Sequence, residues 1–172
     1  MKRVAYLLFI MLMAFAFAGC GSGNQTSDET DAPTRPTQAI GGQELLPMIT
    51  IWVGDALVEA EIASSPAAQA QGLSGRAALH EGKGMLFSYA EPLIPTFWMK
   101  EMRFPIDIIW IRDGMVVDIS PHLPAPLPEI QLADLPRYQP KEPIRYALEV
   151  PAGWAARHKV TNGTRVTIPD GI

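Results

Sequence analysis

Two changes in composition, at Cys20 and near Glu44, restrict the folded part of this chain to its C-terminal portion. Residues 4–18 form one uninterrupted apolar run, whereas residues 21–44 are dominated by Gly, Ser, Thr, Asp, Gln and Pro. A polar segment of this second kind cannot bury enough apolar surface to form a core. We therefore expect one globular domain of ordinary size at residues 45–172, and two large domains are excluded.

The first segment predicts an export signal. Lys2 and Arg3 precede the apolar run, and small residues follow it. A membrane-spanning helix needs about 20 apolar residues, and this run is shorter. A positively charged start, a short apolar stretch and small residues at its end are typical of a cleaved signal peptide. Residues 1–19 are therefore expected to be a signal peptide that is removed on export.

The four residues Phe17-Ala18-Gly19-Cys20 resemble the cleavage box of bacterial lipoproteins. This resemblance implies that the Cys20 thiol is acylated and becomes the mature N-terminus, with residues 20–44 as a lipidated, disordered tether. The protein would then be exported and lipid-anchored to the bacterial cell envelope. Gly21 stands where Asp is associated with inner-membrane retention, so the periplasmic side of the outer membrane is favoured in a Gram-negative source. A plain secretory leader with an incidental cysteine is the alternative.

Composition excludes several kinds of chemistry. Cys20 is the one cysteine, so a disulfide scaffold and thiol catalysis within the domain are excluded. The formal charge of −4 leaves no basic excess that would favour nucleic acid. The domain lacks a nucleophile-elbow motif, a phosphate-binding glycine loop and paired zinc-type cysteines, so we predict no cofactor and no metal. Met99 and Met102 could bind Cu(I), but core packing is the usual role of methionine.

Hydrophobic patterning predicts about eight short strands and two short helices. Gly54-Asp55 and Asp113-Gly114 each join two apolar runs, which favours hairpins. Ser65 and Pro66 are suited to begin a helix as its N-cap and first residue. The fold class is therefore α+β, mostly antiparallel, with the strands forming a compact sheet or a partly closed barrel. Strands are expected at 48–53, 57–63, 85–89, 97–100, 106–111, 115–119, 144–150 and 165–168, and helices at 67–73 and 152–159.

Two segments of this domain differ from the rest. The run Ile106–Ile111 is apolar on both faces, which predicts the most deeply buried strand of the sheet. Residues 121–143 contain seven prolines and no clear period, which predicts a long loop. Loops of this length in compact domains are often functional.

Four charged residues lie inside or beside apolar runs: Arg76, Lys100, Asp107 and Glu149. Burying an unpaired charge is costly, so we expect these groups to converge. They could form an ion-pair network that fixes strand order. They could instead form a site for a polar ligand, with Trp98 as its stacking surface. A third interpretation takes Asp107 and Glu149 as a catalytic carboxylate pair for hydrolysis.

Four blocks of sequence, in the same order along the chain, resemble those of the family called domain of unknown function 192 (DUF192). They comprise Phe97–Lys100 with Phe104–Ile111, Gln71–Arg76, Gly84–Phe87 and Tyr146–Gly153, and the resemblance covers about residues 48–168. It implies a compact, mainly β fold in one domain and places all four charged candidates in family blocks. It supplies no reaction.

These observations favour three functions. The first is an envelope-tethered binding module that holds a small polar or anionic ligand, such as a glycan, near Trp98 and Lys100. The second is a structural or protein-interaction module of the envelope, in which the loop at residues 121–143 docks a partner. The third is a hydrolase that uses Asp107 and Glu149. The expected partners are the membrane, through the anchor at Cys20, and a small ligand, without nucleic acid.

Overall fold

The computed structural model describes residues 45–172. The predicted signal peptide at 1–19, the lipid attachment at Cys20 and the tether at 20–44 lie outside the described residues, and they stay predictions.

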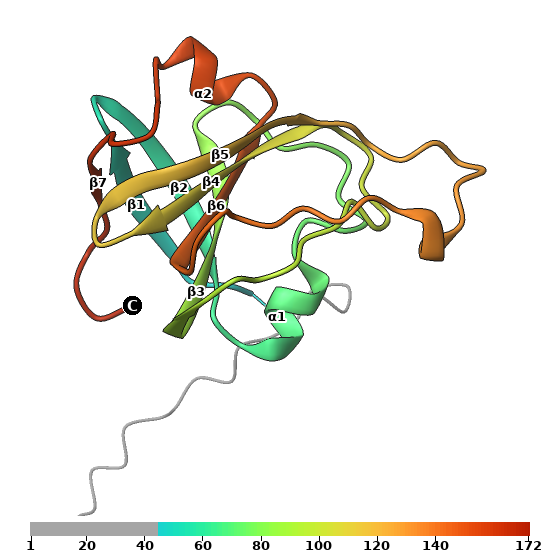
Figure 1. Cartoon of the computed structure of the whole chain (residues 1–172), viewed down its shortest axis with the longest axis horizontal. Helices are drawn as coiled ribbons and strands as arrows, with labels where there is room; N and C mark the ends of the chain where they lie inside the picture. The colour runs from blue at the N-terminus through green and yellow to red at the C-terminus, as the bar shows by residue number, and fades with distance from the viewer. Residues whose placement is uncertain (1–44) are drawn as a thin grey trace, which may run out of the picture. The chain divides into compact units, whose positions relative to one another are not determined.

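The described residues form one mixed seven-stranded sheet with the strand order β5-β4-β6-β3-β2-β1-β7 (Figure 1). β2 and β3 run parallel, and the other neighbouring strands are antiparallel. The predicted α+β class, mostly antiparallel, is therefore confirmed. The strands are β1 (Met48–Val53), β2 (Ala56–Ala63), β3 (Lys83–Leu93), β4 (Ile106–Arg112), β5 (Met115–Leu123), β6 (Ile144–Pro151) and β7 (Val166–Thr167).

Two short α-helices accompany the sheet, α1 (Pro66–Gln71) and α2 (Trp154–Arg157), with a 3-10 turn η1 at Leu132–Asp134. Ser65 caps α1 as predicted, because its hydroxyl accepts a hydrogen bond of 3.1 Å from the backbone N–H of Ala68. The helix ends earlier than the sequence indicates, since Gly72 adopts a φ of 49° and already serves as the C-cap. Within residues 45–172, no helix is long and apolar enough to cross a membrane.

The extended segment predicted at residues 97–100 is not a strand of the sheet. Phe97 pairs with Tyr138 in one isolated bridge, and the chain turns after Met99. Phe97 and Met99 are nevertheless buried, so the apolar pattern reflected packing and not strand pairing. The sheet therefore has seven strands where about eight were expected.

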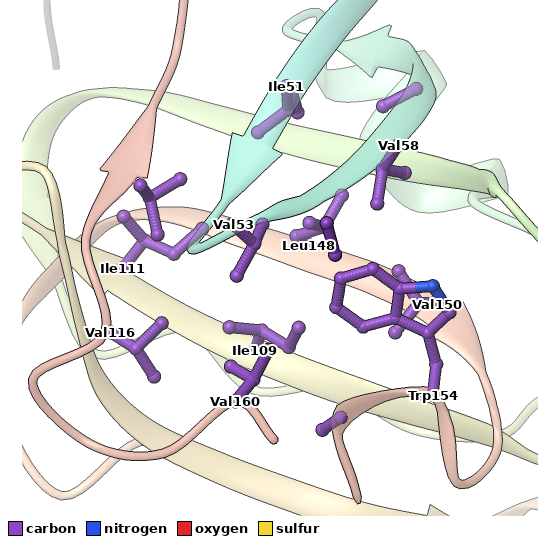
Figure 2. Close-up of a cluster of buried hydrophobic side chains, with 14 of the residues drawn as sticks. Ile51, Val53, Val58, Ile109, Ile111, Val116, Leu148, Val150, Trp154 and Val160 are labelled. Carbon is purple, nitrogen blue, oxygen red and sulfur yellow. The ribbon is translucent and has the colours of Figure 1, made fainter. Parts of the chain in front are cut away.

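The sheet curls until its two edges meet, which gives the partly closed barrel. Met115, the first residue of β5, and Arg165, which precedes β7, form a bridge. The N–H of Val116 donates to the carbonyl of Thr164 at 2.9 Å, and the N–H of Val166 donates to Gly114 at 2.8 Å. The concave side holds a core in which the Trp154 ring of α2 lies beside Val150 (Figure 2). Its other large members are Ile51, Val53, Val58, Ile109, Ile111, Val116, Leu148 and Val160.

A second core covers the convex side of the same sheet. The rings of Phe87, Phe97 and Trp110 pack edge to face there, with centroids 4.8 Å and 5.2 Å apart. Because β4 lies between the two cores, Ile106–Ile111 is buried on both faces, as the sequence predicted.

The proline-rich loop is fastened to the segment that follows β3, and both extend from the same side of the sheet (Figure 1). Phe97 and Tyr138 exchange two backbone hydrogen bonds of 2.9 Å. The Gln139 side-chain amide donates to the Thr96 hydroxyl at 2.8 Å. The loop thus holds in place the chain segment that carries Trp98.

Candidate ligand-binding site

The pairing of β4 with β6 separates the two predicted carboxylates. Asp107 lies opposite Val150 in the register, and Ile108 lies opposite Glu149. Residues that face each other across a ladder share a side of the sheet, and successive residues alternate between sides. Asp107 therefore projects into the concave core and Glu149 to the convex side. The structure does not bring these two groups together as a pair that could flank a scissile bond.

The Asp107 carboxylate is fully buried and accepts three backbone hydrogen bonds. Oδ1 accepts from His122 at 2.8 Å and from Gly153 at 2.9 Å, and Oδ2 accepts from Ala155 at 3.0 Å. Those N–H groups belong to the end of β5 and to the first turn of α2. An acidic group there also complements the dipole of the helix N-terminus. Asp107 thus ties α2 to the sheet, and it lies away from the other predicted site residues.

Arg76 has a partner that the sequence did not indicate. Its guanidinium forms a two-pronged ion pair with Glu61 of β2, in which Nη2 and Oε2 are 2.7 Å apart. The hydrogen bond with Glu61 raises the pKa of Arg76 above its ordinary value, and the nearby Glu149 acts in the same direction. Arg76 therefore stands as a permanent cation beside Glu149.

Glu149 is buried, and its Oε2 has no hydrogen-bond partner among the described residues. Burial raises the pKa of Glu149 to about 8, against the opposing effect of Arg76. The carboxyl is therefore mostly protonated and uncharged at neutral pH. Burial and the proximity of Glu149 likewise raise the pKa of Tyr89 to about 12.

Glu149 lines a pocket of about 380 Å³ between α1, β3 and the segment at residues 96–102. The walls carry four aromatic side chains: Phe87, Tyr89, Phe97 and Trp98. Polar groups at the same pocket come from Gln71, Ser74 and Thr96. Met85, Phe87 and Tyr89 occupy every second position of β3, so their side chains share one face. This period-2 pattern could have revealed them in the sequence.

Trp98 and Lys100 lie close to each other, and a second cation joins them. The Arg137 guanidinium lies 4.3 Å from the Trp98 ring centre, and Lys100 Nζ lies 6.0 Å from it. Both distances suit cation–π attraction. Lys100 also pairs with Glu101 at 3.7 Å. Arg137 comes from the proline-rich loop, where no local pattern marks it as part of a site.

Of the predicted site residues, Trp98 and Glu149 line the pocket. Arg76 lies near Glu149 and Lys100 lies near Trp98, whereas Asp107 is on the other face of the sheet. No group of three His, Cys, Asp or Glu side chains within residues 45–172 is placed to hold a metal ion.

The family of this chain follows from a match over most of its length. Residues 49–168 match the profile of DUF192, described as an uncharacterized ACR, and the chain belongs to that family. The sequence resemblance to DUF192 is thereby confirmed.

Two crystal structures share this fold. A candidate transcription regulator from Sinorhizobium meliloti superposes with a TM-score of 0.64 at 26% identity, over 73% of this chain and 97% of that protein. A protein of unknown function from Novosphingobium aromaticivorans gives a TM-score of 0.65 at 28% identity, over 86% of this chain and 100% of that protein. A search of curated proteins found no match.

Proposed function

We propose that this domain is a binding module that holds a small polar or anionic ligand, such as a glycan fragment, in the pocket beside α1. The observation that carries the proposal is the pocket of about 380 Å³ with four aromatic side chains and a buried carboxyl. Ligand sites are commonly of about this size, with mostly apolar walls and a few polar groups that orient the ligand. Aromatic faces of this kind suit the C–H face of a sugar ring or a flat, unsaturated ring.

The location of the module is part of the same proposal. Acylation of Cys20 would anchor the mature chain in the envelope, on the periplasmic side of the outer membrane in a Gram-negative source. The tether at residues 20–44 would let the pocket sample a zone about 25–30 Å from the membrane by random-coil scaling. Such a placement suits ligands of the cell wall.

Replacing Trp98 with alanine should weaken ligand binding about fivefold to tenfold, because the ligand loses a stacking surface. Calorimetry with sugars, peptidoglycan fragments and organic acids would measure this. Trp52→Ala is the matched control, since Trp52 is 47% exposed on β1 and Trp98 is 39% exposed at the pocket. Equal affinity in the Trp98→Ala variant, or no binding to the unmodified domain, would contradict the proposal.

The exposed tip of the proline-rich loop favours a second function, protein interaction. Leu127, Leu132 and Ile130 are 61%, 50% and 38% exposed. Apolar side chains gathered on one surface segment often mark an interaction site. The backbone of the loop is fastened at Tyr138 and Gln139, so it would present these side chains in a defined position.

Replacing Leu127, Ile130 and Leu132 together with serine should abolish the binding of a partner protein. The free energy of unfolding should change by less than about 1 kcal/mol. Cross-linking in membranes from the source organism, compared between the two forms, would measure the first effect. Urea denaturation would measure the second. An unchanged set of cross-linked proteins argues against this second function and leaves the pocket proposal standing.

A role in transcription, the function suggested for the Sinorhizobium meliloti protein, has no support in the charge of this chain. Proteins that bind DNA rely on Lys and Arg to neutralise phosphates, and a basic patch is their usual footprint. This chain has 14 Lys and Arg against 18 Asp and Glu, which does not favour a nucleic-acid partner.

A further inference from the structure

The polar groups of the pocket are not all satisfied by the protein itself. Among the described residues, two buried side-chain atoms lack a hydrogen-bond partner, Arg76 Nε and Glu149 Oε2. Leaving a buried polar atom unpaired costs about 1–3 kcal/mol, and native proteins keep few such atoms. The Glu149 atom belongs to a carboxyl that lines the pocket. A ligand seated there would supply the missing partner.

We infer that the pocket selects ligands that carry a hydrogen-bond-accepting oxygen next to a flat ring, with the Glu149 carboxyl donating its proton to that oxygen. The inference rests on the proposed binding function and names the class of ligand. Carbonyl, hydroxyl and carboxylate oxygens all qualify as acceptors, and the ring would lie among the aromatic walls.

The charges around the pocket favour this class over amines. Two charged or titratable groups face Glu149: Arg76, which is held by Glu61, and Tyr89 of β3. Lys100 and Arg137 lie against the Trp98 ring. A cationic ligand that reached Glu149 and Trp98 would come near the guanidinium groups of Arg76 and Arg137, and like charges repel at short range. An oxygen acceptor meets no such repulsion and gains a partner in the protonated carboxyl.

This arrangement makes binding depend on pH in a defined direction. Below about pH 8 Glu149 holds its proton and can donate it, and above that pH the carboxylate repels an acceptor oxygen. Affinity for an oxygen acceptor should therefore fall about tenfold between pH 6 and pH 9, as the protonated fraction falls. An amine would show the reverse trend, because the carboxylate would attract it.

Three probes with the same ring test the inference: N,N-dimethylphenylacetamide, phenylacetate and phenethylamine, which keep essentially the same charges from pH 6 to pH 9. Titrations of the domain are followed by NMR chemical shifts of the Trp98 indole. We expect the amide and the carboxylate to bind, more weakly at pH 9. Preferential binding of the amine would overturn the inference while leaving the binding function intact. The same conclusion would follow if the amide and the carboxylate each bound as tightly at pH 9 as at pH 6.

Two variants separate hydrogen-bond donation from folding. Glu149→Gln keeps an N–H donor that does not titrate, so it should bind N,N-dimethylphenylacetamide equally at pH 6 and pH 9. Glu149→Leu has no donor and should lose binding at both. Each variant is first checked for the near-UV circular dichroism of the unmodified domain. If no probe of any charge binds the unmodified domain, the binding function and the inference both fail.

Discussion

Asp107→Ala is expected to lower the free energy of unfolding by about 4 kcal/mol, the sum of losses at several hydrogen bonds to a charged group. The substitution removes the acceptor of three backbone N–H groups, at His122, Gly153 and Ala155. It also leaves a void in the concave core beside α2. For a domain of this size, the midpoint of thermal unfolding should fall by more than about 10 °C.

Urea denaturation of purified variants would measure this loss. Asp107→Asn should cost about half as much, because the amide oxygen can keep the two bonds that Oδ1 accepts, while its NH2 group meets the N–H of Ala155. Asp55→Ala, in the exposed turn between β1 and β2, is the control and should change stability by less than about 0.5 kcal/mol. A stable Asp107→Ala variant would refute the structural role given to this residue.

Glu149→Gln is expected to stabilise the domain at pH 8 by up to about 4 kcal/mol, and at pH 5 by only about 1 kcal/mol. An exposed glutamate in the unfolded chain releases its proton near pH 4.3. In the folded domain burial raises the pKa of Glu149 to about 8. Between these values the folded state holds the extra proton, so the free energy of unfolding falls as pH rises and levels off above pH 8.

Guanidinium denaturation at unit steps from pH 5 to pH 9 would show the difference. Between pH 5 and pH 8 the free energy of unfolding of the unmodified domain should fall by up to about 1.4 kcal/mol for each pH unit, because the folded state binds up to one more proton than the unfolded state. Glu149→Gln should lack that component, because an amide does not titrate. The control Glu91→Gln removes an exposed carboxyl of β3 and should follow the unmodified profile. Parallel profiles for Glu149→Gln and the unmodified domain would show that Glu149 is ionised when folded.

These two carboxyls have different surroundings, although they lie on neighbouring strands. Asp107 receives three N–H donors and ties elements of the fold together. No donor among the described residues reaches Oε2 of Glu149, and the Glu149 side chain lines a pocket. A buried acid that weakens the fold at neutral pH is the pattern expected of a group kept for binding.

Most of the fold could be predicted from the sequence, because strand periodicity and turn residues act over short distances. The hairpin at Asp113-Gly114, the cap at Ser65 and the doubly buried β4 all follow from such local signals. The segment at 97–100 was wrongly expected to be a strand. There the apolar residues are buried against the convex face of the sheet, and a local pattern cannot distinguish that burial from strand pairing.

The candidate site was predictable only in part. Charges inside apolar runs pointed to Arg76, Lys100, Asp107 and Glu149, because burying a charge needs a compensating partner. The partners themselves, Glu61 for Arg76 and three backbone N–H groups for Asp107, come from segments distant along the chain. Arg137 reaches Trp98 from a loop with no periodicity at all.

The sequence by itself determined that residues 45–172 carry the hydrophobic pattern of one mostly antiparallel α+β domain, and it identified the family. Both conclusions rest on patterns that are local or that match in order along the chain. Tertiary structure alone decided which of the buried charges meet. The register of β4 against β6 turns Asp107 and Glu149 to opposite faces, since side chains alternate at every residue. Curling of the sheet and fastening of the proline-rich loop then leave Glu149, but not Asp107, at a pocket.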